Sequence, residues 1–192
     1  MVLMYMQFQF MERIGNMKRQ IRRGAFETNS SSTHAINVYR RTKNRWSDIP
    51  DYVIVHQGEF GWENGIWNDW EDKLAYLYTA CVSKCTKWVQ DEITGTYSSK
   101  FDNKLFKDYQ YRIKSALETC GVNDVIFADR EEDEGYIDHS DELGDSFIES
   151  ILNDWFEDFI FNDASYIETG NDNDESNVSE DPNAAWSYYK SN

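Results

Sequence analysis

The sequence predicts an α+β fold, in which a mixed β-sheet of about four strands is packed by three main helices. Hydrophobic residues make up 40% of the 192 residues and aromatic residues 16%, which is enough apolar surface for a core. The apolar spacing predicts the order β-β-α-α-β-α-β, which differs from the strict alternation of parallel α/β folds. With only 2 Pro and 10 Gly, the chain is not low-complexity.

The strands are predicted from short apolar runs between turn residues. Alternation over residues 35–40 predicts the first strand, and the β-branched run at 52–56 predicts the second. The glycine-rich stretch 58–65 predicts a turn. Two later runs, at 122–128 and 165–169, complete the four strands.

The helices are predicted from apolar residues spaced three and four apart. The first begins at Asn68, with a glutamate three positions later as in a capping box, and ends near residues 92–95. The second spans about 103–120, and Gly121 is placed to terminate it. The third spans 145–161 and carries acidic side chains on its outer face.

The predicted domain is residues 17–170, followed by an acidic C-terminal tail at 171–192, in which Trp186, Tyr188 and Tyr189 could dock on the domain. Two interpretations of residues 1–16 are open. Their alternating apolar residues suit a strand, but Met17 would serve equally well as a start, which would make them an N-terminal extension.

Charge is sorted along the chain, whose formal net charge is −16. Residues 1–45 carry nine Lys or Arg against two Glu, a net charge of +7. Between Asp124 and Asp181, twenty-one Asp or Glu face the single Arg130, a net charge of −20. Such asymmetry bears on binding partners rather than on the fold.

The three cysteines and the N-terminus predict a reducing, cytoplasmic setting. Three is an odd number of Cys, and the first residues lack the basic region and cleavage site of a secretory signal. No apolar run approaches the ~18 residues that a membrane helix needs. We predict free thiols, no membrane association and no cofactor.

The densest group of polar side chains lies between residues 22 and 36, directly before the first predicted strand. Successive backbone N–H groups and hydroxyls can cradle a phosphate, and an arginine adds positive charge. Alternatively these residues only shape a turn, because Ser, Thr and Asn side chains bond to nearby backbone. The candidate binding residues are Arg22, Glu27, Thr28, Asn29, Ser30 and Ser32.

A reaction at this segment would use Ser31 as nucleophile, with His34 and His139 as proton carriers. Asp138 and Asp172 are the carboxylates that we expect beside them. The chain has no Gly-x-Ser-x-Gly motif, and neighbours in sequence rarely reach the geometry of a catalytic Ser–His pair. Whether the protein is an enzyme stays open.

The same two histidines and two aspartates would also suit a metal ion, since imidazole and carboxylate bind Zn²⁺ or Mn²⁺. Their scattered positions show no metal-binding spacing, and the Asp- and Asn-rich residues 171–175 lack the glycine and final glutamate of an EF-hand loop. We therefore predict no metal site.

The pattern Arg-x-Gly-x-Phe-Glu-Thr-Asn-Ser-Ser-Ser-x-His, at residues 22–34, resembles the N-terminal signature of a family of uncharacterised bacteriophage and prophage proteins. Three short segments, at 58–63, 136–139 and 170–173, also resemble that family. The resemblance spans about residues 17–175. It implies a phage origin and an intracellular host setting, and it supports residues 1–16 as an extension. It implies no reaction.

Two functional hypotheses follow. In the first, a phage accessory protein in the host cytoplasm uses an acidic, nucleic-acid-mimicking surface to inhibit a host or defence protein that normally binds nucleic acid. Direct nucleic-acid binding is not expected, above all for the acidic half, although the basic region 13–45 could contact a phosphate backbone. The partner-binding residues would be Glu149, Asp154, Glu157 and Asp158. In the second, a small enzyme or ligand-binding protein acts on a phosphate-bearing substrate at residues 27–34.

Overall fold

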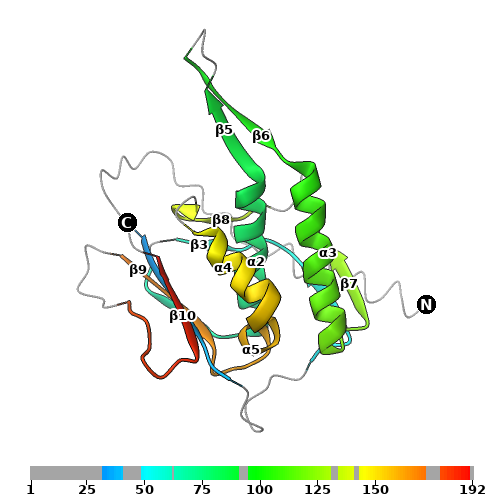
Figure 1. Cartoon of the computed structure of the whole chain (residues 1–192), viewed down its shortest axis with the longest axis vertical. Coiled ribbons are helices and arrows are strands. Elements are labelled where there is room, and N and C mark those ends of the chain that lie inside the picture. Colours follow the sequence, from blue (N-terminus) through cyan, green and yellow to red (C-terminus); the bar gives the residue numbers. More distant parts are fainter. Residues whose placement is uncertain are drawn as a thin grey trace, which may run out of the picture.

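An antiparallel four-stranded sheet forms the centre of the molecule, and the α+β class is confirmed (Figure 1). The computed structural model describes residues 32–40, 49–61, 63–90, 95–130, 134–140, 143–171 and 178–190. The strand order is β10-β1-β9-β4, and each neighbouring pair is antiparallel. Its strands are β1 (Ser32–Val38), β4 (Gly65–Trp67), β9 (Tyr166–Asn171) and β10 (Trp186–Lys190).

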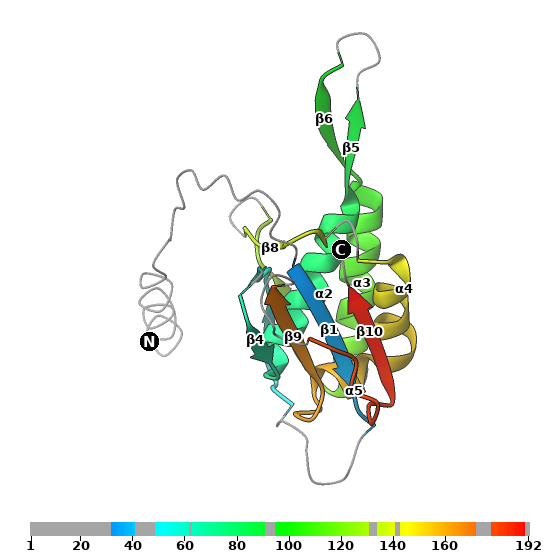
Figure 2. The ribbon, with the colours of Figure 1, turned by 90° about the vertical axis from the view of Figure 1, so that its left-hand side faces the viewer.

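The helices lie together on one face of this sheet (Figure 2). The third predicted helix is a continuous run of three segments, with a π-helical turn in its middle. The helical elements are α2 (Trp70–Cys85), α3 (Asn103–Cys120), α4 (Asp145–Ser150), η2 (Ile151–Trp155) and α5 (Phe156–Ile160).

Six short strands pair outside the central sheet. The pairs β2–β7 and β3–β8 are parallel, whereas β5–β6 is an antiparallel hairpin. The strands are β2 (Tyr52–Val55), β3 (Glu59–Phe60), β5 (Thr86–Gln90), β6 (Tyr97–Phe101), β7 (Asp124–Phe127) and β8 (Tyr136–Ile137). The single mixed sheet that the sequence predicted is therefore divided, because β2 and β7 pair with each other and not with β1.

The core lies between the central sheet and the helices. All seven residues of β1 are buried, so both faces of this strand are covered. Phe147 of α4 contacts the rings of Tyr76 on α2 and Phe159 on α5. It also contacts Trp186 and Tyr188 on β10. One side chain therefore joins two helical segments to the edge of the sheet.

The predicted acidic tail at 171–192 is wrong for residues 186–190, which pair with β1 as β10. The aromatic rings at positions 186 and 188 face the core, and this burial outweighs the polar composition of the preceding residues. The proposed extension, residues 1–16, lies outside the described part of the chain.

The first helix also differs from its prediction at both ends. Asp69, and not Asn68, is the N-cap, and its side chain accepts no capping hydrogen bond. The helix ends at Cys85 instead of at 92–95, because Thr86–Gln90 pair with Tyr97–Phe101. Residues 86–90, which were predicted as the last turns of this helix, therefore form the first strand of a hairpin.

The end of α3 provides a test of local backbone geometry. Gly121 has a φ of 108°, and the amides of Gly121 and Val122 donate to the carbonyls of Glu118 and Leu117. This is a Schellman motif, which favours glycine. We expect Gly121→Ala to lower the free energy of unfolding by about 1 kcal/mol, because a Cβ disfavours this φ.

The cost is conformational, since an added Cβ at Gly121 would meet no other atom within 4 Å. Gly121→Asn is the control, because asparagine tolerates left-handed geometry and should lose less stability. Denaturant unfolding of both variants measures the difference. Equal losses of unfolding free energy in Gly121→Ala and Gly121→Asn would show that the left-handed φ is not the cause of the loss.

Candidate functional site

Four segments that lie far apart in the sequence meet at the end of the sheet where β1 begins. Ser32 pairs with Asn171 at the end of β9, and its hydroxyl donates to the Asp138 carbonyl at 3.2 Å. The Asp138 amide donates to the Phe60 carbonyl at 2.9 Å. Glu63 accepts a hydrogen bond from the Thr169 hydroxyl through its carbonyl, at 2.7 Å. The end of the segment 22–34 is thus joined to 58–63, 136–139 and 170–171.

His34 is fully buried at this end of the sheet, on the side that faces α2. Its Nδ1 lies 2.8 Å from the hydroxyl oxygen of Tyr76. This is the only hydrogen bond of the Tyr76 hydroxyl to a described residue, so we infer that the hydroxyl donates and Nδ1 accepts. In the neutral ring the proton then resides on Nε2.

The Nε2 atom of His34 has no hydrogen-bond partner among the described residues, although it is buried. The backbone of Gly61 acts on the ring as a hydrogen-bond partner that raises its pKa, but no contact of Nε2 meets the distance and angle of a formed hydrogen bond. A buried donor without a partner costs about 1–3 kcal/mol, so such a group needs an explanation.

The pKa of His34 is lowered to about 3, first by burial and then by the positive charge of Lys190. A smaller effect of His139 acts in the same direction, whereas the Gly61 backbone opposes them. At neutral pH the ring is therefore uncharged and suited to donate a hydrogen bond from Nε2. The predicted role of His34 as a proton carrier near neutral pH does not fit this pKa.

Lys190 and Ser32 complete the buried part of the site. The Lys190 ammonium donates to the backbone carbonyl and to the hydroxyl of Ser32, both at 3.0 Å. Lys190 is 2% exposed, so its charge is held inside the protein. The contacts of Ser32 agree with the structural interpretation of this residue, because its polar groups organise the start of the strand.

His139 and Asp138 lie closer to the surface. The His139 Nε2 is 3.9 Å from an Asp138 carboxylate oxygen, and their side chains are 42% and 29% exposed. His139 has a φ of 51°, in the left-handed region that few residues other than glycine adopt. Of the two imidazoles at this site, that of His139 is therefore the more exposed.

The remaining predicted site residues adjoin this cluster in sequence but lie outside the described residues. Ser31 directly precedes Ser32, and Asp172 directly follows Asn171. Their predicted roles stay predictions, as do those of Arg22, Glu27, Thr28, Asn29 and Ser30.

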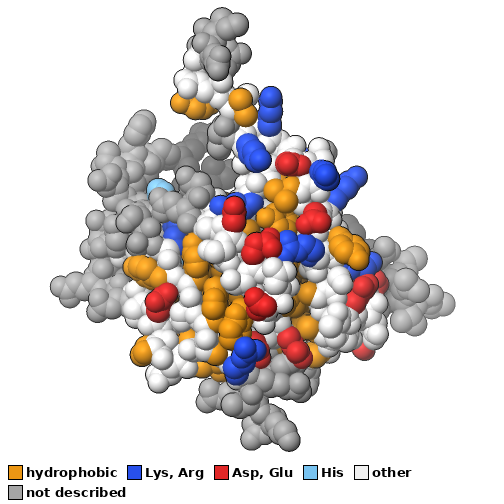
Figure 3. Space-filling model, in the orientation of Figure 1, with side chains coloured by type: hydrophobic (Ala, Val, Ile, Leu, Met, Phe, Trp, Pro, Cys, Tyr) orange, Lys and Arg blue, Asp and Glu red, His pale blue; other side chains and the backbone are white. Residues whose placement is uncertain are grey.

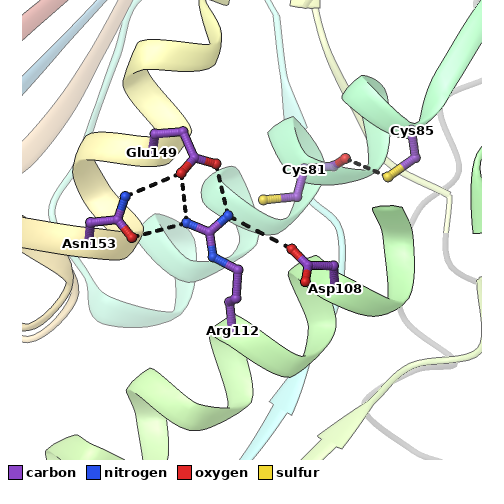
Figure 4. A network of polar contacts seen from close by, with 6 residues as sticks. All are labelled: Cys81, Cys85, Asp108, Arg112, Glu149 and Asn153. Atoms are coloured by element: carbon purple, nitrogen blue, oxygen red, sulfur yellow. Dashed lines mark hydrogen bonds and ion pairs between the residues drawn. The ribbon is translucent and has the colours of Figure 1, made fainter. Parts of the chain in front are cut away.

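The acidic face of α4–α5 is partly neutralised within the fold (Figure 4). The Arg112 guanidinium donates to both carboxylate oxygens of Glu149, at 2.8 and 2.9 Å, and to the Asn153 side chain at 3.2 Å. This contact holds the pKa of Glu149 below its usual value. Arg40 donates to Asp158 at 3.2 Å and stacks 3.9 Å above the ring of Trp155.

Acidic and basic side chains are consequently interspersed on this face (Figure 3). A nucleic-acid mimic needs a dense array of carboxylates, whereas two of the four predicted partner-binding residues already bind arginines. For Asp154 and Glu157 the partner-binding role stays a prediction.

Two residues of the site were missed from the sequence, Tyr76 and Lys190. Tyr76 lies within a helix in which most residues are buried, so nothing in the sequence distinguishes its hydroxyl. Lys190 shares the alternation of Trp186 and Tyr188, which could have placed it at a strand position facing the core.

No group of three or more His, Cys, Asp or Glu side chains in the described ranges is arranged to hold a metal ion. In the same ranges, no helix has the length and apolar character needed to cross a membrane. Comparison with protein-family models, with curated proteins and with solved structures found no match to this chain.

Proposed function

We propose that this protein binds a phosphate-bearing ligand at the end of the sheet where β1 begins. One observation carries the proposal: the Nε2 of His34 is a buried hydrogen-bond donor without a partner among the described residues. A ligand acceptor atom would supply the missing partner and remove the cost of leaving the donor unpaired.

Electrostatics favours an anion as that ligand. Lys190 pairs in register with His34, and its positive charge is the largest charge effect that lowers the pKa of this ring. Negative charge is therefore stabilised beside Nε2. The hydroxyls of Thr28, Ser30 and Ser31 and the guanidinium of Arg22 are the further donors that the sequence offers a phosphate.

If a reaction follows binding, His34 positions the ligand and does not transfer the proton, since its ring stays neutral over a wide pH range. His139 is then the imidazole placed to carry the proton, because it is partly exposed. Ser31 remains the candidate nucleophile. The proposal concerns binding, and it holds whether or not a reaction takes place.

The test is the binding of inorganic phosphate, nucleotides and sugar phosphates, measured by thermal shift and calorimetry. We expect at least one phosphate compound to raise the melting temperature. The Lys190→Met and His34→Phe variants should bind it at least about ten-fold more weakly, because each removes a donor or charge beside the anion. His34→Gln should retain most of the affinity, since its amide keeps a donor and an acceptor.

Lys73→Met is the matched control. Lys73 is also a buried lysine, and it donates to the carbonyls of Asn162 and Ser165 beyond the opposite end of β9. The Lys73→Met variant should therefore lower the stability of the protein without changing its affinity for the phosphate compound. If a variant fails to fold, the Nε2 resonance of histidine-labelled wild type is followed during phosphate titration. No response of that resonance, or of the melting temperature, to any phosphate compound would contradict the proposal.

A further inference from the structure

The β5–β6 hairpin projects from the body of the molecule, beyond the ends of α2 and α3 (Figures 1 and 2). Four of the five residues of β6 are exposed, so the hairpin has little core of its own. The base of the hairpin is held by Phe101, whose ring contacts the ring of Phe106. The guanidinium of Arg130 also lies over the Phe101 ring, 4.1 Å from its centre. An isolated two-stranded hairpin is only marginally stable, so the contacts at its base hold it in place.

Two lysines stand directly opposite each other on this hairpin. Lys87 of β5 pairs in register with Lys100 of β6, and both are exposed. Side chains in register lie on the same face, where like charges are destabilising. This arrangement opposes folding, but it concentrates positive charge for an anionic partner.

The positive charge continues from the hairpin onto α3. Lys104 and Lys107 are exposed, and they lie three residues apart on one side of the first two turns. Figure 3 shows several Lys and Arg side chains over the base of the hairpin and the adjoining part of α3, with acidic side chains among them. We name these four residues, Lys87, Lys100, Lys104 and Lys107, the hairpin lysines.

Exposed aromatic rings accompany the hairpin lysines. Tyr97 at the outer end of β6 is 65% exposed, and Tyr111 on α3 is 72% exposed. Nucleic-acid-binding surfaces combine lysines that contact the phosphate backbone with aromatic rings on which bases stack.

We propose that the hairpin lysines bind the phosphate backbone of nucleic acid. A two-stranded β-ribbon is narrow enough to enter the major groove of a duplex, and its exposed tyrosine can stack on unpaired bases. The site is separate from the ligand site at the start of β1, so either proposal can fail without the other. It differs from the acidic-mimic hypothesis, because the protein would contact nucleic acid directly.

The test is fluorescence anisotropy of the full chain with labelled single-stranded and duplex DNA of about 20 nucleotides, across a salt series. Four phosphate contacts predict that log K falls with log salt at a slope of about −3 to −4. Lys100→Glu should weaken binding at least about ten-fold. It should also fold normally, because it replaces a repulsive cross-strand pair with an attractive one.

Lys114→Glu is the matched control, since it changes the net charge equally. Lys114 lies farther along α3, 3.8 Å from Glu118, so its charge is already balanced. The affinity of the Lys114→Glu variant for DNA should stay within about two-fold of wild type. Absent binding at about 50 mM salt, or equal losses for both variants, would overturn the proposal. Polyglutamate binding as tightly as DNA would also overturn it, and would indicate an acidic protein partner.

Discussion

Truncation of Phe147 to alanine is expected to lower the free energy of unfolding by about 3–5 kcal/mol. Phe147 is fully buried, and its ring contacts Tyr76, Phe159, Trp186 and Tyr188. Removing it would leave a cavity at the junction of α2, α5 and β10. Urea unfolding followed by far-UV circular dichroism measures the loss.

Tyr111→Ala is the control for this prediction. Its side chain is 72% exposed on a helix, so truncation should change stability by less than about 0.5 kcal/mol. Tryptophan fluorescence of native Phe147→Ala gives a second measurement, because Trp186 lies against Phe147. A loss below about 1 kcal/mol, with unchanged fluorescence, would mean that β10 does not dock against α4 as described.

The elements with strong local signals were predictable from the sequence. The prediction for α3 matches its observed span, because Asp102 caps its first turn and Gly121 ends it. Strands β2 and β7 were also placed within two residues of their observed ends. Such signals act between near neighbours in the chain, so they can be read from the sequence before the fold is known.

The elements that depend on a partner strand were predicted wrongly or only in part. Residues 86–90 continue an apolar helical spacing, yet they form a strand because residues 97–101 pair with them. Residues 186–190 follow an acidic stretch that resembles a tail, yet β1 and Phe147 hold them in place. In both cases tertiary contacts outweigh local composition.

The candidate site was predicted only in part, for a similar reason. His34, Ser32, Asp138 and His139 were recognised as reactive or polar residues, and the structure brings them together. Lys190 was not recognised, because a lysine in a polar C-terminal stretch gives no sign that it will be buried. The sequence also could not show that His34 would be uncharged, since its low pKa arises from burial and from Lys190.

The low pKa of His34 predicts a loss of stability in acid. Unfolded chains bind a proton on histidine below about pH 6.5, whereas folded His34 does so only below about pH 3. Between these values the unfolded state binds more protons than the folded state, so the free energy of unfolding decreases as the pH falls. The stability that comes from keeping His34 uncharged is fully present above about pH 6.5 and is lost by about pH 3. The shift corresponds to about 4–5 kcal/mol, which is an upper limit.

Measurement of unfolding free energies between pH 7 and pH 4 for wild type and His34→Gln isolates this effect, because carboxylates contribute equally to both proteins. The wild-type curve should fall more steeply, and the difference should grow as the pH decreases. His56→Gln is the matched control, because it makes the same substitution at an exposed histidine. Parallel curves for wild type and His34→Gln would show that His34 is not held uncharged. If phosphate binds beside Nε2, its negative charge will raise the pKa of His34, and added phosphate should reduce the difference between the curves.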